Sequence, residues 1–139
     1  MSAVQAYRGG LRDHATMQAN ASSLSNQDIE DIAAYFAAQG LEEHDSNYSA
    51  DSASMEAGKE LATPCAACHG DTGFQTAAPT NPVLAGQYKS YIEQALKGYQ
   101  SGSRRSAIMA GFTTLLTDDD INNLAAWFSS QKSPLKTAE

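Results

Sequence analysis

The sequence TPCAACHGDTG at residues 63–73 contains the pattern C-x-x-C-H, formed by Cys65, Cys68 and His69. Residues three apart lie on one face of a helical turn, so both thiols can reach the two vinyl groups of a single haem and form thioethers. The histidine that follows directly can then bind the iron as the proximal ligand. Because these are the only two cysteines in the chain, neither has another disulfide partner. The motif therefore predicts covalently attached haem c, one per chain.

Three other interpretations of this motif fit less well. A structural zinc site needs a fourth ligand, usually from a second pair at similar spacing, and the remaining histidines, His14 and His44, stand alone. A thioredoxin-like redox pair follows a β-strand, and no strand pattern precedes Cys65. A simple disulfide does not require a histidine at the next position. We expect His14 and His44 to be exposed to solvent.

Composition excludes two classes of function. The chain has 139 residues and a net charge of −7, so it lacks the basic surface that nucleic-acid binding requires. No apolar run has the length of a membrane span. The N-terminal sequence MSAVQAYRGG also lacks the apolar core of a signal peptide. Because haem c is normally attached after export, we expect that a leader or an upstream segment is absent from this chain.

An internal repeat divides the chain. Residues 7–39 align without gaps on residues 99–131, an offset of 92 positions. Matching pairs include Tyr7 and Tyr99, Arg12 and Arg104, Met17 and Met109, Asp28 and Asp120, and Phe36 and Phe128. The first copy lacks the region in which its own C-x-x-C-H would lie, so the chain resembles one and a half domains. We predict a partial repeat at 1–40, a linker at 41–53, a complete domain at 54–132 and a tail at 133–139.

Apolar residues recur at helical spacing and no segment alternates as a strand does, so we predict an all-α fold. Ser25 with Asp28, and Thr117 with Asp120, have the spacing of capping boxes that begin the last helix of each copy. Gly40 is expected to end the first of these two helices.

The complete copy is predicted to begin near Ser54 with a short helix that leads into the haem motif. Gly58 within this helix is expected to allow a close helix–helix contact. The turn-rich residues 70–82 are expected to form a loop. The next helix carries an apolar and aromatic stripe that we expect to pack in a core around the haem: Tyr88, Tyr91, Ile92, Ala95, Leu96 and Tyr99.

The sixth iron ligand is predicted to be Met109. A methionine thioether stabilises ferrous iron and raises the reduction potential. Met55 lies on the helix that precedes the haem motif and is expected to fill space in the core. Met109 lies in the irregular stretch SRRSAIMAGFTTLL, residues 103–116, where a loop can fold over the haem face opposite His69.

The order of these segments resembles class I cytochrome c, and most closely the dihaem cytochrome c-4 type, in which two such domains run in tandem. The resemblance covers residues 52–132 as a whole domain and residues 5–40 as the end of another. It rests on the haem motif and the Met109 segment together with PVLAGQ (82–87), YIEQALKGYQSGSR (91–104) and LTDDDINNLAAWFSSQ (116–131).

This resemblance implies the roles of individual residues. Cys65 and Cys68 would attach the haem, with His69 and Met109 as the axial ligands. The Pro82 carbonyl would accept the other ring N–H of His69 and fix its orientation. Tyr91 would lie among the haem contacts, and Arg104 and Arg105 would neutralise the haem propionates.

With both axial positions occupied, the iron has no vacant site for oxygen or peroxide. The expected function is therefore electron transfer by a soluble, periplasmic bacterial carrier that is not an enzyme and has no catalytic residues. Its partners would be respiratory redox proteins, for example a terminal oxidase or another reductase, met through small and electrostatically steered contacts. The apolar face of residues 1–40 would be covered by the complete copy or by a second chain in a homodimer.

Two alternatives stay open from sequence. In the first alternative, the chain is an electron-entry domain of a larger redox enzyme. In the second, Met109 is not a ligand and the open iron position makes the protein a haem sensor or a haem enzyme.

Overall fold

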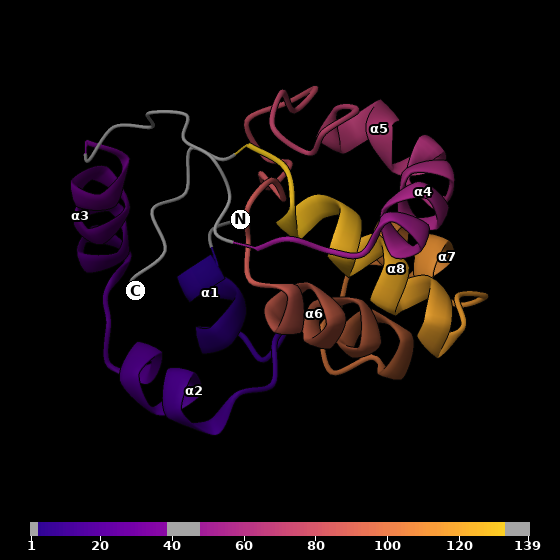
Figure 1. Cartoon of the computed structure of the whole chain (residues 1–139). Coiled ribbons are helices and arrows are strands. Elements are labelled where there is room, and N and C mark those ends of the chain that lie inside the picture. Colours follow the sequence, from indigo (N-terminus) through magenta and orange to yellow (C-terminus); the bar gives the residue numbers. More distant parts are fainter. Residues whose placement is uncertain (1–2, 39–47, 133–139) are drawn as a thin grey trace.

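The computed structural model describes residues 3–38 and 48–132 (Figure 1). These residues form eight α-helices: α1 (Ala3–Arg8), α2 (Ala15–Ser22), α3 (Asn26–Ala37), α4 (Ser52–Leu61), α5 (Thr63–His69), α6 (Lys89–Ser101), α7 (Ala107–Thr113) and α8 (Asp118–Ser129). Within the same ranges β-pairing is limited to an isolated antiparallel bridge between Arg12 and Arg104. The prediction of an all-α fold is confirmed.

The internal repeat recurs in the helices. Helices α3 and α8 begin and end at equivalent positions, 92 residues apart, and α2 and α7 both begin at an alanine with the same offset. A glycine precedes each of these shorter helices in the left-handed region, with φ of 70° at Gly10 and 81° at Gly102. Positive φ is accessible to glycine at little cost, so both copies turn the chain at the same point.

Both predicted capping boxes are formed. The Ser25 hydroxyl accepts the Asp28 backbone N–H at 3.1 Å, and the Asp28 carboxylate accepts the Ser25 N–H at 2.8 Å. Thr117 and Asp120 make the same two bonds at 3.1 and 2.8 Å. Because the first turn of a helix has no intrahelical acceptors for its N–H groups, these bonds fix where α3 and α8 begin.

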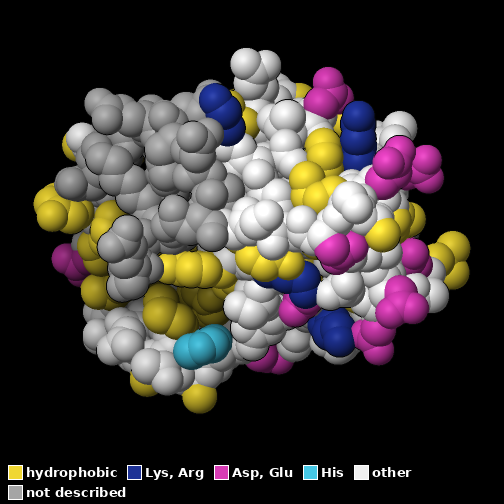
Figure 2. All heavy atoms as spheres, in the orientation of Figure 1, with side chains coloured by type: hydrophobic (Ala, Val, Ile, Leu, Met, Phe, Trp, Pro, Cys, Tyr) yellow, Lys and Arg dark blue, Asp and Glu magenta, His cyan; other side chains and the backbone are white. Residues whose placement is uncertain are grey.

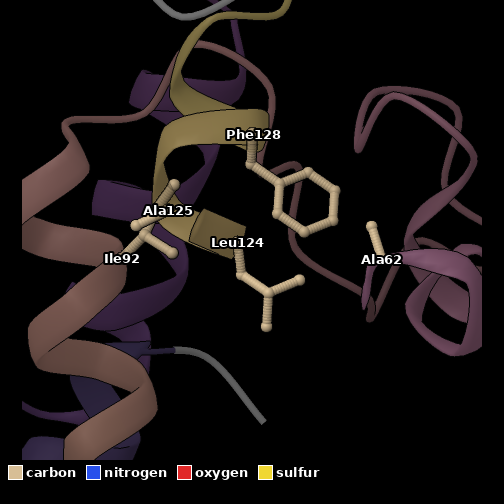
Figure 3. Packing of buried hydrophobic residues seen from close by; sticks show 5 residues of the cluster. All are labelled: Ala62, Ile92, Leu124, Ala125 and Phe128. Carbon is tan, nitrogen blue, oxygen red and sulfur yellow. The ribbon is translucent and has the colours of Figure 1, made fainter. Parts of the chain in front are cut away.

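The core of the complete copy lies around α8. Figure 3 shows Leu124 and Phe128 of α8 pointing toward Ala62, whereas Ala125 faces Ile92 of α6. These five residues are all buried. Burial of such side chains contributes about 1.5–3 kcal/mol for each large one, so α8 is the element on which the other helices of this copy depend.

Gly58 lets α4 approach α8 closely, as the sequence predicted. A Cβ atom at this position would lie 2.1 Å from the Asn123 carbonyl oxygen and 2.8 Å from Cβ of Trp127. Helix α4 begins at Ser52 rather than near Ser54, because the Asp51 carboxylate accepts the backbone N–H groups of Ala53 and Ser54.

The predicted stripe on α6 and the predicted end of α3 are each met only in part. Ile92 of α6 is buried, whereas Tyr88 and Tyr91 are 50% and 42% exposed. Tyr88 is the N-cap of α6 and not part of the helix, and the packing of Tyr91 against the haem stays a prediction. Helix α3 ends at Ala37 with Ala38 as its C-cap, and both Gly40 and His44 lie outside the described residues.

The partial copy is joined to the complete copy through backbone hydrogen bonds. The Asp13 N–H donates to the Ser103 carbonyl at 2.8 Å, and the Arg105 N–H donates to the Leu11 carbonyl at 2.7 Å. The two bonds are equivalent under the repeat, because residues 11 and 13 correspond to 103 and 105. The contact therefore relates the two copies by an approximate two-fold axis at Arg12 and Arg104.

Helix α3 extends away from this contact (Figure 1). Its residues Tyr35 and Phe36 are 64% and 67% exposed, and hydrophobic side chains lie on this part of the surface in Figure 2. Among the described helices, none has both the length and the hydrophobicity that crossing a membrane requires.

Candidate haem-binding site

Helix α5 carries the C-x-x-C-H motif and follows α4 almost without a break. Pro64 lies in its first turn, where the missing N–H is not needed and the fixed φ suits a helix. Cys65 and Cys68 are free thiols, and both are half-buried. Burial raises the pKa of the Cys65 thiol, and the neighbouring Cys68 raises it further. Both sulfurs are thus held on one short helix, where they can attach a single haem.

The last residue of α5, His69, is 6% exposed. Its Nδ1 lies 2.9 Å from the Pro82 carbonyl oxygen, the contact that the sequence resemblance implied. A carbonyl can only accept, so Nδ1 carries a proton, and in the neutral imidazole Nε2 then keeps its lone pair. This tautomer and orientation suit an imidazole that binds a metal through Nε2.

Further hydrogen bonds hold Pro82 in place. The Asn81 side-chain amide donates to the Cys68 carbonyl at 2.9 Å, and the Ala77 N–H donates to the same oxygen at 3.0 Å. These bonds close the loop onto the end of α5. Asn81 was not singled out from sequence, where its only signal was the position next to Pro82.

The loop after the motif also packs against α8. Gly73 has a φ of +79°, and a Cβ atom there would lie 2.7 Å from Cδ1 of Phe128. The Gly73 carbonyl accepts the Leu84 N–H at 2.7 Å. The Gly86 N–H donates to the Phe128 carbonyl at 2.9 Å. The core residue Phe128 therefore supports the loop that orients His69.

Met109 lies in α7 and not in an irregular loop, so the expectation about its local structure was wrong. The Ser106 hydroxyl caps the helix by accepting the Met109 N–H at 3.3 Å. Residues 107–113 contain no proline that would break a helix, so the Ser106 cap is enough to start this short one. Met109 is half-buried, and its role as an iron ligand stays a prediction.

The two predicted propionate partners, Arg104 and Arg105, have different surroundings, and their roles stay predictions. Its guanidinium lies 4.9 Å from the Tyr99 ring centroid and 5.7 Å from that of Tyr91. Its Nε atom is buried and has no hydrogen-bond partner. Arg105, by contrast, is exposed. The structure therefore brings Arg104 and Tyr91 together.

The residues present fit a covalent haem c. Two thiols, an imidazole whose Nε2 is left unprotonated and a buried guanidinium N–H without an acceptor are the groups that such a cofactor would use. Met109, a half-buried thioether, adds a soft donor in the same copy. The chemistry of this donor set matches haem better than any other group with which the motif was compared.

Comparison with known proteins agrees with this assignment. The cytochrome c family model matches residues 55–132. Cytochrome c-554(548) of Halomonas halodenitrificans is 40% identical over 79 residues, covering 55% of this chain and 94% of the relative. Cytochrome c4 of Pseudomonas aeruginosa is 39% identical over 83 residues, covering 60% of this chain but 41% of the relative.

Two solved structures resemble both copies together. Reduced recombinant cytochrome c4 from Pseudomonas stutzeri has a TM-score of 0.78 and 27% identity, covering 92% of this chain and 77% of that one. Thiosulfate dehydrogenase (TsdBA) from Marichromatium purpuratum has a TM-score of 0.79 and 29% identity over 92% of this chain and 29% of that one. With its fold, its C-x-x-C-H motif and the match across the complete copy, the chain belongs to the cytochrome c family and binds haem c covalently.

Proposed function

We propose that this chain carries single electrons between redox proteins through a haem c attached to Cys65 and Cys68, with His69 and Met109 as axial ligands. The observation that carries the proposal is the 2.9 Å contact between Nδ1 of His69 and the Pro82 carbonyl. It sets the tautomer that metal binding needs, on a side chain that the fold buries.

Each residue has a separate task. Cys65 and Cys68 keep the cofactor in the protein, and Pro82 holds the His69 ring in one orientation. Met109 would be the second side chain to hold the iron and would raise the reduction potential, as thioether ligands do. When bound, the haem supplies an iron that alternates between the ferrous and ferric states. Because no position is left for a substrate, the chain itself is a carrier and not an enzyme.

The partners that we propose are periplasmic redox enzymes of a respiratory chain. The structural similarity to part of a thiosulfate dehydrogenase supports an enzyme of this kind as donor. The net charge of −7, with Asp118, Asp119 and Asp120 together at the start of α8, favours a partner with a basic docking surface. Such an encounter is expected to weaken as ionic strength rises.

Carbon monoxide tests the closed coordination directly. We expect the reduced wild-type spectrum to be unchanged by the gas, because both axial positions are occupied. Replacing Met109 with alanine should leave the haem attached, remove the weak far-red band of methionine-bound ferric haem, lower the potential and allow carbon monoxide to bind. Met17→Ala is the matched control, since it changes the equivalent methionine of the partial copy. It should keep the haem attached, retain the far-red band and still exclude carbon monoxide.

An unchanged spectrum and potential in Met109→Ala would show that another group binds the iron. A wild-type protein that binds carbon monoxide would instead favour a haem sensor or a haem enzyme. Pyridine haemochrome measurement per polypeptide should give a ratio of one haem, because the chain has a single cysteine pair.

A further inference from the structure

We propose that the partial copy completes the haem site of the complete copy. Arg12 and Arg104 together form a carboxylate-binding site between the two copies, and the carboxylate is a haem propionate. The proposal rests on the proposed function, because it assumes the haem c attached at Cys65 and Cys68.

The backbone places the two arginines together. They form the antiparallel bridge between the copies, flanked by the hydrogen bonds of Asp13 with Ser103 and of Arg105 with Leu11. These bonds involve only backbone atoms. The position of each arginine is therefore fixed independently of its side chain, and either side chain can be replaced without removing the bridge.

Aromatic rings hold both guanidinium groups in equivalent ways. Arg12 lies 5.7 Å from the centroid of Tyr7, and Arg104 lies 4.9 Å from that of Tyr99, the equivalent tyrosine. Stacking on a ring leaves the edge of a guanidinium, with its N–H donors, free for an anion. The repeat has thus preserved an arginine and its supporting ring in each copy.

Gly98 leaves space for the Arg104 side chain to lie against α6. A Cβ atom at position 98 would lie 3.1 Å from both Cγ and Cδ of Arg104. The equivalent residue of the partial copy is Ala6. The glycine is therefore specific to the copy that carries the haem motif, and it allows the Arg104 side chain to lie against the helix.

The two arginines border one cavity, and within residues 3–38 and 48–132 neither forms an ion pair. A cavity of about 210 Å³ is lined by residues of both copies, including Arg12, Met17, Tyr91 and Arg104. Asp13 and His14 also border it. Yet the ion pairs found in the described part of the chain involve lysines, and neither Arg12 nor Arg104 takes part in one. Positive charge that is partly removed from water, with a buried Nε lacking an acceptor, favours an anionic ligand.

The repeat indicates which anion binds. In the partial copy, Tyr7, Arg12 and Met17 border one cavity. Their equivalents in the complete copy are Tyr99, Arg104 and Met109, the proposed iron ligand. An arginine thus lies five positions before the methionine of each copy, and in the complete copy that methionine is the proposed iron ligand. We therefore take the anion to be a haem propionate, which a guanidinium can bind through two parallel N–H donors.

The test is the reduction potential of the purified holoprotein, measured by spectroelectrochemistry for Arg104→Gln, Arg12→Gln and Arg105→Gln. A cation near the iron disfavours the ferric state, and an unpaired propionate favours it, so losing either arginine should lower the potential. We expect a downward shift for Arg104→Gln, a smaller one for Arg12→Gln and no shift for the exposed Arg105→Gln. The double variant should shift less than the sum of the two single variants, because both side chains act on one carboxylate.

Several outcomes would overturn the proposal. Equal potentials in Arg104→Gln and Arg105→Gln would show that Arg104 does not bind the propionate. An unchanged potential in Arg12→Gln would show that the partial copy does not contribute to the site. A wild-type potential that changes when sulfate replaces chloride at constant ionic strength, with no such change in Arg12→Gln, would assign the site to a free oxyanion. Should Arg104→Gln fail to fold by circular dichroism, Arg12→Gln and the sulfate titration decide the result. A wild type without a reversible couple would instead refute the proposed function.

Discussion

Helices α3 and α8 have the same length, the same type of N-terminal cap and closely related sequences, but they have different surroundings. The first-turn isoleucine is buried in both copies, at Ile29 and Ile121. Two turns later the copies diverge, because Phe36 is 67% exposed whereas its equivalent Phe128 is 3% exposed. A shared sequence pattern has therefore produced the same helix twice, but among the described residues the core cluster lies in the complete copy.

The difference comes from the neighbouring helices. In the complete copy, α4 meets α8 at Gly58, and α6 covers the other side through Ile92. Among the described residues, the partial copy has no equivalent of α4, and α1 corresponds only to the end of α6. Caps and periodicity determine a helix locally, but burial requires partner helices that come from elsewhere in the chain.

The largest contrast is expected between Phe128→Ala and Phe36→Ala. Removing the buried ring should cost about 3–5 kcal/mol in the free energy of unfolding, because it leaves a cavity under the loop that supports His69. Removing the exposed ring should change it by less than about 0.5 kcal/mol. Denaturant unfolding of the holoprotein, followed by circular dichroism and by Soret absorbance, measures both values.

Equal losses in the two variants would show that Phe36 is buried in solution. Light scattering then tests whether a second chain covers Phe36. If it does, the predicted symmetric dimer through residues 1–40 should dissociate more readily in Phe36→Ala. A wild type that is monomeric at all concentrations would leave the dimer without support.

Local chemistry in the sequence was sufficient for much of this fold. The capping boxes at Ser25 and Thr117 and the close contact at Gly58 depend on a few neighbouring residues or on the lack of a side chain, and all were predicted correctly. The haem motif was also predictable from neighbouring residues alone, since the spacing of Cys65, Cys68 and His69 on one helical turn determines how they lie relative to one another. The helical start at Ser52 was missed by two residues because Asp51 was not recognised as a cap.

Other features depend on contacts between distant segments. Met109 was assigned to a loop because its stretch has no helical periodicity, yet a single hydroxyl at Ser106 starts the helix. The pairing of Arg12 with Arg104 could not be read from either segment alone. The repeat identified the two arginines as equivalent, but only the folded chain shows that equivalent residues also meet.

A smaller contrast is expected between the two N-caps. Thr117→Ala should lower the global free energy of unfolding by about 1 kcal/mol, a typical cost of losing a cap on a helix that carries the core. Ser25→Ala removes the same bonds from a helix whose outer face is exposed, so its global effect should stay within about 0.5 kcal/mol. Hydrogen exchange should instead show faster opening of the α3 amides, because local unfolding of that helix becomes easier. Equal global losses for the two variants would mean that α3 unfolds together with the complete copy.

The smallest expected effect is the acid dependence of the α8 cap. The Thr117 backbone N–H and hydroxyl both bond to the Asp120 carboxylate, and they lower its pKa below the ordinary value of 3.8. A carboxyl group with a lowered folded-state pKa stabilises the fold while it is ionised, so its contribution is full above pH 3.8 and is lost as the pH falls through the folded value. The difference in unfolding free energy between wild type and Asp120→Asn should therefore be constant at higher pH and should shrink once the pH falls below 3.8.

Asp28→Asn provides the matched comparison. The Ser25 hydroxyl and backbone N–H lower the pKa of Asp28 in the same direction. Asp28 is exposed and Asp120 is only half-buried, so the two local effects should be similar and small. If the copies differ as their packing indicates, the acid dependence of Asp28 should appear in the exchange of α3 amides and not in global unfolding. An Asp120→Asn difference that does not change with pH would show that the carboxylate acts through geometry rather than charge.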